Sequence, residues 1–332
     1  MTTTRRAFAA LIGLFAASLT ANLAVNPAAA ESYPNRTVTI VVTSAAGALT
    51  DVLTRAVSQR LSQMWGQSIV VENRGGAGHN IAATAVKAAA ADGYTLLSSE
   101  TGFVTSQPHL HSKGKLSYDA ETDFIPVAGY AGIPIGLLVH PSVPAKSIGE
   151  LIALAKAKPG AMTYGTAGLG TALHTGALLL ESLAGIKMTA VHYRGAAPAL
   201  NDLIAGHINM ITMGPSVALP AVADGKLNML GFGSEQRVAQ FPNVPTIAET
   251  VPGYEAAVSF GLFAPKSVPR DILIKINADI QKIIHDPEFH KRFLESLVVQ
   301  PIPGSMEAFA EYLHKDSVKW AKVISAANLK ID

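Results

Sequence analysis

Three short loops of small residues are the parts of this sequence best suited to hold a ligand. They are Gly47-Ala48-Leu49, Gly168-Leu169-Gly170-Thr171 and Gly195-Ala196-Ala197, and each directly precedes a predicted helix. The first-turn N–H groups of a helix have no partner within it, and the positive end of the helix dipole attracts anions. Each loop alone also fits an ordinary turn or cap. Three together favour the binding of a carboxylate or phosphate by backbone amides.

Patterns typical of enzymes and metal sites are missing. The sequence contains no GxSxG, GxxxxGK[ST], HExxH or EF-hand pattern, and its lack of cysteine excludes thiolate nucleophiles, Cys-ligated zinc and iron–sulfur clusters. His109 and His111 are two residues apart, and His285 and His290 are five apart. Neither spacing brings two imidazoles onto one face of a helix. We therefore expect no catalytic residues, no metal and no cofactor.

A glycine pair after the second predicted strand has the beginning of a dinucleotide-binding pattern. Gly76-Ala77-Gly78 would supply its first two glycines, but the third small position is Ile81. The next acidic residue, Asp92, precedes the following strand instead of ending it. Both departures argue against a nucleotide site.

The first thirty residues have the organisation of a secretory signal. Arg5-Arg6 precede an uncharged apolar stretch over Ala7–Val25, and Ala28-Ala29-Ala30 provides a small-residue cleavage site near Ala30. An uncleaved membrane anchor is the alternative, because the apolar stretch is almost long enough to span a bilayer. Thr4–Phe8 also resembles a twin-arginine signal, which leaves the Sec and Tat routes both open. We expect a signal peptide at residues 1–30 and export from the cytoplasm.

The charges of the mature chain balance. Removing Arg5 and Arg6 from the 26 lysines and arginines leaves 24, equal to the 24 acidic residues. Nucleic acids and anionic lipids require a positive surface, which a neutral chain without a basic tract does not provide. We expect no nucleic-acid partner, and instead a small molecule or another protein.

Short β-branched runs alternate with helical patterns along the first half of the mature chain. Val38–Val42 is typical of a buried strand, and residues 69–71 and 94–97 are further strands. Between the first two, apolar residues recur at spacings of four, four and three and predict a helix that ends before Gly66: Leu53, Val57, Leu61 and Met64. An alanine-rich helix is expected over residues 81–90.

The second half repeats this pattern. Strands are expected at residues 135–139, 162–164 and 188–192, with helices between and after them, the first opened by a capping box at Ser147–Glu150. The C-terminal third is mostly helical; Asp286-Pro287 begins one helix, and the last runs from Met306 to about Ala327. The sequence therefore predicts an α/β protein of two similar lobes with largely parallel sheets.

Many ordered motifs of the mature chain resemble the Bug or TctC-like family, the extracytoplasmic solute-binding receptors of tripartite tricarboxylate transporters. They include Tyr33-Pro34-Asn35-Arg36, Val70-Val71-Glu72-Asn73-Arg74, Ala91-Asp92-Gly93-Tyr94-Thr95, Tyr193-Arg194-Gly195, Pro242-Asn243-Val244-Pro245-Thr246 and Gly261-Leu262-Phe263-Ala264-Pro265.

The resemblance implies a two-lobed, Venus-flytrap periplasmic-binding fold. The chain would cross between lobes twice, near Val127–Ile133 and near Glu255–Leu262. Residues 31–130 and 257–332 would form the first lobe and residues 131–256 the second.

The resemblance also implies a function. We expect a periplasmic, monomeric binding protein that captures a di-, tri- or aromatic carboxylate in the cleft and delivers it to the membrane permease subunits of the transporter. Lobe closure would signal occupancy. Two alternatives are a secreted enzyme acting on a carboxylate with His174 as base, and a ligand-sensing module for a membrane kinase.

The ligand-binding residues that the resemblance implies come from both lobes. In the first lobe they are Ala46, Gly47, Ala48 and Leu49, with Glu100 and Thr101 after the third strand. In the second lobe they are Thr166, Gly168, Gly170, Thr171, His174, Arg194, Gly195 and Ala196, with Met213 at the cleft edge.

Three departures from the family pattern bear on the ligand. Ala45-Ala46-Gly47-Ala48 replaces a Pro-Pro-Gly-Gly run, which changes the rigidity of the first loop. Glu100 replaces a small polar residue, so its carboxylate would either point away from an anionic ligand, which we favour, or bind a donor on the ligand. Met213 stands where some relatives have an acid suited to a ligand amine, which argues against amino acids.

Four side chains could refine the specificity of this cleft. Phe103 and Met213 would either line an apolar slot for an alkyl or aromatic ligand or pack within the lobes. His174 would contact the ligand or simply cap a helix. Arg194 would be a surface arginine or would meet a second carboxylate in fork geometry.

Overall fold

The computed structural model describes residues 33–76, 79–112, 114–295, 298–302 and 304–331, and the predicted signal peptide at residues 1–30 lies outside them. All the elements below belong to the compact unit of residues 36–332. In the described ranges, no helix combines the length and the apolar character needed to cross a membrane.

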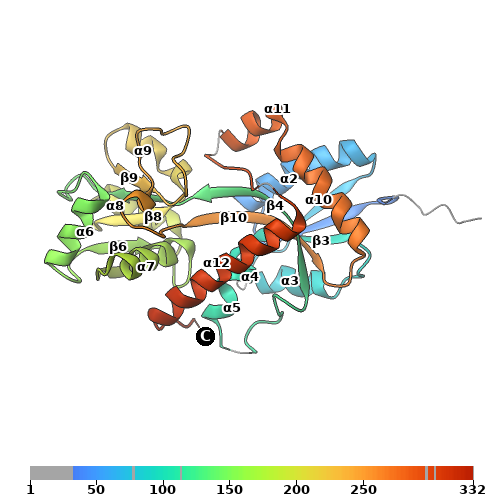
Figure 1. Cartoon of the computed structure of the whole chain (residues 1–332), viewed down its shortest axis with the longest axis horizontal. Coiled ribbons are helices and arrows are strands. Elements are labelled where there is room, and N and C mark those ends of the chain that lie inside the picture. The colour runs from blue at the N-terminus through green and yellow to red at the C-terminus, as the bar shows by residue number, and fades with distance from the viewer. Residues whose placement is uncertain (1–32, 77–78, 113, 296–297, 303, 332) are drawn as a thin grey trace, which may run out of the picture. The chain divides into compact units, whose positions relative to one another are not determined.

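The first lobe is built on a five-stranded sheet (Figure 1). Its strand order is β2 (Ile69–Asn73), β1 (Val38–Val42), β3 (Thr95–Glu100), β10 (Ala257–Pro265) and β4 (Phe124–Pro134). The first three strands are parallel, whereas β10 is antiparallel to both of its neighbours.

The second lobe repeats this plan. Its sheet has the order β7 (Thr189–His192), β6 (Thr163–Thr166), β8 (Met210–Met213), β5 (Gly136–Val139) and β9 (Asn228–Phe232). Again three strands are parallel and the other two are antiparallel to their neighbours. The predicted pair of similar α/β lobes is confirmed. The sheets are mixed and not largely parallel, because β10 in the first sheet and β5 in the second run antiparallel to both neighbouring strands.

Helices α2 (Leu49–Trp65), α3 (Asn80–Lys87) and α10 (Arg270–Ile284) pack on the first sheet. Leu53, Val57 and Leu61 of α2 are buried, as their spacing predicts. Met64 is 45% exposed, so its predicted place in the core is wrong. The helix ends where expected, because Gly66 takes a left-handed conformation with φ 65° and donates its N–H to the Ser62 carbonyl.

The helices of the second lobe are α6 (Ile148–Ala157), α7 (Ala172–Ala184), α8 (Ala196–Ile204) and the short α9 (Leu219–Ala223), with 3-10 turns at Pro215–Val217 and Ile247–Glu249. The Ser147 hydroxyl caps α6 by accepting from the Glu150 N–H at 3.2 Å. The Glu150 carboxylate accepts from Lys146 N–H instead of the Ser147 N–H, so only half of the predicted capping box forms.

Several short elements complete the fold. Helices α4 (Gly102–Thr105) and α5 (Gln107–Leu110) directly follow β3. Asp286 and Pro287 begin α11 (Pro287–Phe289) as predicted, and the Asp286 carboxylate accepts from the Phe289 N–H. A π-helical turn continues α11 through His290–Leu294.

Two adjacent segments connect the lobes. The chain leaves the first sheet after Pro134 and returns before Ala257, where these two residues pair. Backbone hydrogen bonds join Ile135 N–H to the Ala256 carbonyl, Ala256 N–H to the Gly233 carbonyl and Gly233 N–H to the Ile135 carbonyl. The two predicted crossings are present, although the first lies slightly later than residues 127–133, since β4 stays paired in the first sheet to its end.

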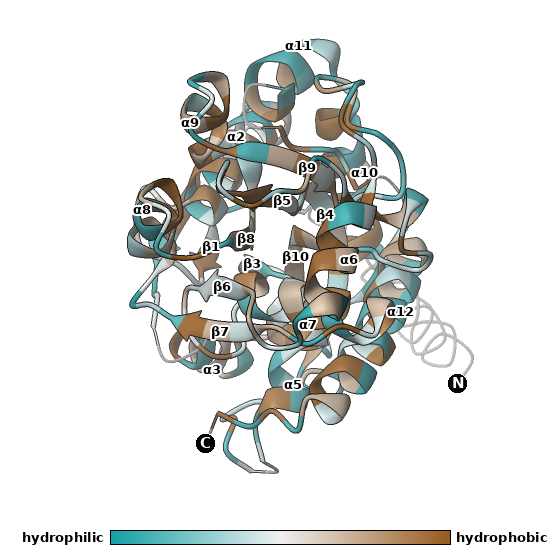
Figure 2. Cartoon of the chain, turned by 90° about the vertical axis from the view of Figure 1, so that its left-hand side faces the viewer, coloured by the Kyte–Doolittle hydropathy of each residue, from teal (hydrophilic) through white to brown (hydrophobic). Residues whose placement is uncertain are grey.

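The C-terminal helix α12 (Met306–Ala326) contacts both lobes. Its N-terminal half buries Phe309 and Leu313 among first-lobe aromatic residues, and its C-terminal half buries Trp320, Val323 and Ile324 in the second-lobe core. It packs against β4 and α4 at one end and α7 at the other (Figure 1). Figure 2 shows its alternation of polar and apolar segments.

Candidate functional site

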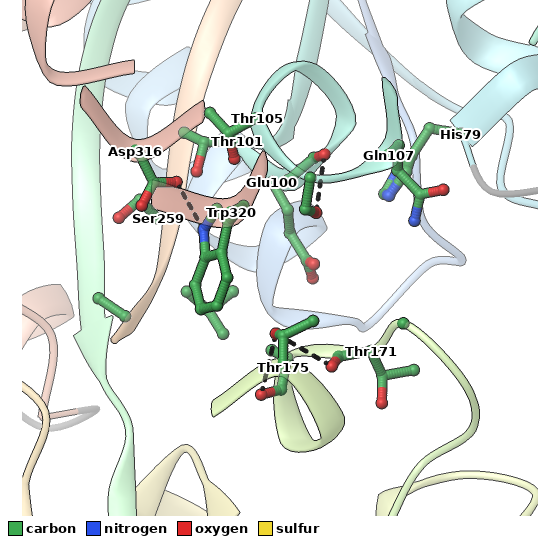
Figure 3. Close-up of a pocket in the computed structure, with 16 residues that line it drawn as sticks. His79, Glu100, Thr101, Thr105, Gln107, Thr171, Thr175, Ser259, Asp316 and Trp320 are labelled. Carbon is green, nitrogen blue, oxygen red and sulfur yellow. Dashed lines mark hydrogen bonds between the residues drawn. The ribbon is translucent and has the colours of Figure 1, made fainter. Parts of the chain in front are cut away.

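A cavity of about 190 Å³ opens between residues of the two lobes. Its wall combines the end of β3 and the start of α4, the start of α7, the start of β10 and one face of α12 (Figure 3). The lining residues are His79, Glu100, Thr101, Gly102, Thr105, Ser106, Gln107, Gly170, Thr171, Ala172, Thr175, Ala257, Val258, Ser259, Asp316 and Trp320.

Glu100 is the central side chain of this cavity. It is the last residue of β3, opposite Phe260 of β10, and its carboxyl group extends into the space between Trp320 and Thr175 (Figure 3). Within the described residues it has no hydrogen-bond or ion-pair partner, and burial raises the pKa of its carboxyl group. Of the two orientations expected for Glu100, the structure shows the one in which the carboxyl group faces the cavity and not the favoured one that points away.

The other titratable groups on the wall are His79 and Asp316. Asp316 accepts a hydrogen bond from Trp320 Nε1 at 3.0 Å and pairs with Lys319 Nζ at 2.7 Å. His79 Nδ1 is buried and has no hydrogen-bond partner in the part of the chain that the structure describes, and burial lowers the pKa of the imidazole to about 4. His79 is thus neutral at neutral pH. The lining includes no lysine or arginine from the described part of the chain.

Hydroxyl groups supply most of the remaining polarity. Thr171 Oγ1 donates to the Gly168 carbonyl at 2.8 Å, and Thr175 Oγ1 donates to the Thr171 carbonyl at 3.2 Å. Ser259 Oγ bonds Tyr312 Oη at 2.7 Å, whereas the buried Thr105 Oγ1 has no hydrogen-bond partner among the described residues. These hydroxyls can still accept, so the wall offers both acceptors and a few donors to a polar ligand.

The loop before α2 lies outside the cavity lining, and some of its backbone N–H groups already donate hydrogen bonds within the protein. Gly47 N–H donates to Asp51 Oδ2 at 2.9 Å, and Ala48 N–H donates to the Ala45 carbonyl. Ala46 and Gly47 are exposed, and Ala48 and Leu49 are half-buried. The prediction that the Gly47 and Ala48 amides are unoccupied donors is wrong.

Asp51 was not predicted as part of this loop's structure. Its buried carboxylate also accepts from Arg55 Nε and Asn73 Nδ2, each at 2.9 Å. Burial alone would raise the pKa of Asp51, but the hydrogen bonds from Arg55, Gly47 and Asn73 lower it below its usual value. An acid in the first helical turn, four residues after a loop glycine, is a sequence signal for such a loop-to-helix bond.

The loop before α7 brings Gly170 and Thr171 to the cavity, together with Ala172 and Thr175. Thr166 and Gly168 lie behind it, and the Gly168 N–H donates to Thr166 Oγ1 at 3.2 Å. Gly170 N–H donates to His174 Nδ1 at 3.2 Å, so this amide too is occupied.

His174 is a buried residue that positions the loop. Burial, and secondly the nearby His192, lower the pKa of His174 to about 4. Its neutral Nδ1 is occupied by the Gly170 amide, and the side chain does not line the cavity. The ligand contact by His174 stays a prediction.

Arg194, Gly195 and Ala196 lie at the start of α8, outside the cavity lining. Arg194 is exposed, and no hydrogen bond or ion pair joins it to another described residue. Gly195 has φ 120°, a conformation that side chains other than glycine rarely adopt.

Phe103 and Met213 do not form an apolar slot. Phe103 is fully buried against Phe263, Phe124 and Tyr118, with ring centroids 4.7–5.6 Å apart. Met213 is 2% exposed in the separate apolar cluster of the second lobe. Both side chains therefore stabilise the interior of their own lobe, which is the second of the two alternatives expected for them.

Sequence reasoning missed the contribution of α12 and of the start of β10. Asp316 and Trp320 are four residues apart, so they share one helix face, but nothing in the sequence indicates that this face meets the end of β3. His79, Gln107 and Thr175 were also missed, although His79 directly follows the glycine-rich segment Gly76-Ala77-Gly78.

Among the described residues, no group of three or more histidine or acidic side chains is placed to hold a metal ion. The expected absence of a cofactor remains a prediction.

A search against known proteins identifies the chain's relatives. Residues 53–329 match the model of the tripartite tricarboxylate transporter family receptor. BugT of Bordetella pertussis is 30% identical over 97% of this chain and 98% of its own length. Rpa4515 of R. palustris, solved with adipate, is 33% identical with a TM-score of 0.76 and covers 90% of this chain and 99% of that one.

A second solved relative, MatC of Rhodopseudomonas palustris with bound malate, is 30% identical with a TM-score of 0.71. It covers 88% of this chain and 100% of its own. These similarities confirm the two-lobed periplasmic-binding fold. The chain belongs to the tripartite tricarboxylate transporter receptor family.

Proposed function

We propose that this protein is a periplasmic receptor that captures a small carboxylate between its lobes and delivers it to a tripartite tricarboxylate-type permease. The observation that carries this proposal is the polar cavity between Glu100 at the end of β3 and the start of α7. The adipate and malate held by the related structures support a carboxylate as the ligand class.

In this proposal the second lobe holds the ligand anion. In the first turn of α7, His174 N–H already donates to the Thr171 carbonyl, but no side-chain cap bond occupies the turn. The amides of Ala172 and Leu173 would therefore meet the ligand, and Thr171 and Thr175 add hydroxyls beside them. The exposed Arg194 at the start of α8 is available to a second carboxylate after closure. Lobe closure about the paired segments at Ile135 and Ala256 would then bury the ligand.

The proposed lobes are residues 31–134 with 257–332, and residues 135–256, with the first boundary moved from residue 130 to the end of β4. The ligand would contact the predicted loop residues 46–49, 100–101, 166–171 and 194–196 when the lobes close. We further propose that the protein acts as a monomer, after removal of residues 1–30, and releases its ligand chemically unchanged.

Thermal unfolding of residues 31–332 tests the ligand class. The panel contains adipate, malate, citrate and benzoate, with adipamide and aspartate as controls. At about a hundred times Kd, a ligand adds roughly 2.7 kcal/mol to the free energy of unfolding and shifts the Tm by several degrees. A shift with a carboxylate but not with adipamide supports the proposal, and no shift with any carboxylate contradicts it.

The variant Ala172→Asp tests the site. It places a carboxylate in the first turn of α7, where a negative charge favours the helix but repels a bound anion. Calorimetry should show at least a hundredfold loss of carboxylate affinity with little change in Tm. Gly170 is less suitable, because it has φ 72° and an added Cβ would lie 2.8 Å from Leu110 Cδ1.

Gly149→Asp is the matched control. It adds the same charge to the first turn of α6, where the glycine is exposed and an added Cβ would lie no closer than 3.9 Å to Thr250. Affinity should be unchanged in this variant. Equal affinity in the wild type and Ala172→Asp would show that the ligand binds elsewhere.

A further inference from the structure

The cavity contains a carboxyl group that an anionic ligand must meet. Glu100 lines it and extends into its centre, and no described side chain or backbone group bonds its carboxyl oxygens (Figure 3). An ionised carboxylate in such a place would lack compensation for its lost hydration. It would also repel a ligand of the same charge.

The charged and titratable groups around Glu100 do not relieve this problem. On the α3 side, His79 is neutral because burial lowers its pKa to about 4. On α12, Asp316 already pairs with Lys319 at 2.7 Å, and the same Lys319 donates to the Glu255 carbonyl at 2.9 Å. That lysine is therefore engaged and does not line the cavity.

The remaining elements around Glu100 contribute only neutral groups. These are Thr101, Gln107 of α5, Ser259 of β10 and Thr171 and Thr175 at the start of α7. No described residue of the wall thus offers a cation to an ionised Glu100. Burial accordingly raises the pKa of Glu100, and a neighbouring ligand anion would raise it further.

We propose that Glu100 binds the ligand as the neutral carboxylic acid and donates its O–H hydrogen bond to a carboxylate oxygen of the ligand. This inference rests on the proposed function. The proton comes from solvent whenever Glu100 is ionised in the empty protein, so that the complex gains one proton per ligand under those conditions. No covalent bond changes.

A neutral Glu100 does not repel an anionic ligand and can contribute to the choice of ligand. A protonated carboxyl group supplies one O–H donor and one acceptor, which is the pattern that a carboxylate or a carboxylic acid complements. An ammonium group would instead stabilise the ionised form of Glu100. The protonation state of Glu100 therefore distinguishes a carboxylate partner, beside which Glu100 is neutral, from an ammonium partner, beside which it is ionised.

Carbon-13 NMR measures the protonation state of Glu100 directly. The mature chain is labelled at the glutamate Cδ atoms, and the Glu100 signal is assigned by its absence in Glu100→Gln. Spectra are recorded at pH 7 with saturating adipate or malate, whichever raises the Tm. A Glu100 signal at the position of a protonated carboxyl supports the proposal, and one at the position of a carboxylate overturns it.

Binding to the variants provides a second readout. Gln is a neutral isostere that retains an N–H donor, so Glu100→Gln should bind the same carboxylate within about tenfold of the wild type at pH 7. Because Gln does not titrate, the affinity of Glu100→Gln for the carboxylate should not weaken between pH 6 and 9, whereas the wild type can lose the Glu100 proton over this range. A hundredfold loss in Glu100→Gln would show that an ionised Glu100 is required.

Glu311→Gln is the matched control. Glu311 is exposed on α12 and pairs with Lys315 at 3.4 Å, away from the cavity. This variant should match the wild type in affinity at every pH. If the wild type binds no carboxylate, the proposed function itself fails. If it binds one with Glu100 ionised, only the present inference fails.

Discussion

The loop before α2 in the first lobe and the loop before α7 in the second lobe are held by the same kind of hydrogen bond, but the accepting groups differ. In the first lobe, Gly47 N–H donates to the carboxylate of Asp51, and in the second, Gly170 N–H donates to the neutral imidazole of His174. Each acceptor lies four residues after its glycine, in the first turn of α2 or α7. A shared fold thus places a charge in one lobe and a neutral ring in the other.

The same asymmetry recurs at the end of the third parallel strand. Glu100 ends β3 and faces the cavity, whereas Met213 ends β8 and is buried in the apolar core. The first lobe therefore brings carboxyl groups toward the ligand, and the second brings hydroxyls, a helix N-terminus and Arg194. An anionic ligand fits this arrangement if the second lobe holds it and Glu100 is neutral.

Asp51→Ala should give the largest loss of stability. It removes the buried carboxylate that accepts hydrogen bonds from Gly47 N–H, Arg55 Nε and Asn73 Nδ2. We expect the free energy of unfolding to fall by about 3 kcal/mol. Urea unfolding measures the loss, with Asp224→Ala on the exposed pair with Lys226 as the control. A cost below about 1 kcal/mol would show that the carboxylate does not organise this loop.

His174 should make the second lobe sensitive to acid. Its folded-state pKa of about 4 lies below the usual 6.5, so the unfolded chain binds the proton more readily. The stability that this group contributes is complete above pH 6.5 and is lost as the pH falls toward 4, by about 2 kcal/mol.

The variant His174→Asn isolates this effect, because its side-chain oxygen replaces Nδ1 as acceptor without titrating. The difference in free energy of unfolding between pH 7 and pH 4 should be smaller in the variant than in the wild type. Equal pH dependence of the two proteins would mean that His174 is not the group responsible.

Asp279 and Glu249 have equally low pKa values, but the first carboxylate is buried and the second lies on the surface. Comparing them shows how much the stabilising effect of an ion pair depends on burial. Burial opposes ionisation of Asp279, but hydrogen bonds from Lys275, Lys282 and Trp65 lower its pKa to about 2. Glu249 has a pKa of about 2, caused chiefly by its hydrogen bonds from the exposed Arg237.

Asp279→Asn should lower the free energy of unfolding by about 1 kcal/mol at pH 7, because solvent screens the interactions of Asp279 with its exposed lysines. This loss should be larger than the loss in Glu249→Gln. Since the folded-state pKa is lowered, the Asp279 contribution is present above pH 3.8 and disappears as the pH falls through about 2. Chemical unfolding at pH 7 and pH 2.5 measures it. A larger loss in Glu249→Gln would contradict the role assigned to burial.

Glu100→Gln should change the free energy of unfolding least, and its pH dependence should be opposite in sign to that of Asp279 and His174. The raised pKa of Glu100 means that its contribution is greatest below pH 4.5 and falls as the pH rises above that value. The ligand-free variant should therefore become more stable relative to the wild type between pH 4 and pH 8. Thermal unfolding across this range checks the trend, and a constant difference would contradict a raised pKa.

The sequence predicted the fold better than the site. Periodicity located β1, α6 and α12 within one or two residues, because local apolar patterns and caps determine these elements. The start of the helix predicted from Ile81 was also located within one residue, whereas Met64, on the predicted apolar face of α2, is exposed. Such errors arise because periodicity does not show which turn of a helix leaves the sheet.

The site depended on contacts that no local pattern records. Glu100, Thr101, Gly170 and Thr171 were identified through the family resemblance and do line the cavity. The direction of Glu100 was not predictable, since it follows from the packing of Trp320, more than 200 residues away in the chain, beside the end of β3. The occupied amides of Gly47 and Gly170 were missed because their acceptors are side chains in the following helix.

A crystal structure of residues 31–332 grown with the carboxylate that most raises the Tm would test the central claim most directly. We predict one ligand between the lobes, with a carboxylate oxygen within hydrogen-bond distance of Glu100 and the ligand in contact with the start of α7. A carboxylate bound outside this cavity, with the space beside Glu100 filled by protein side chains, would contradict the account.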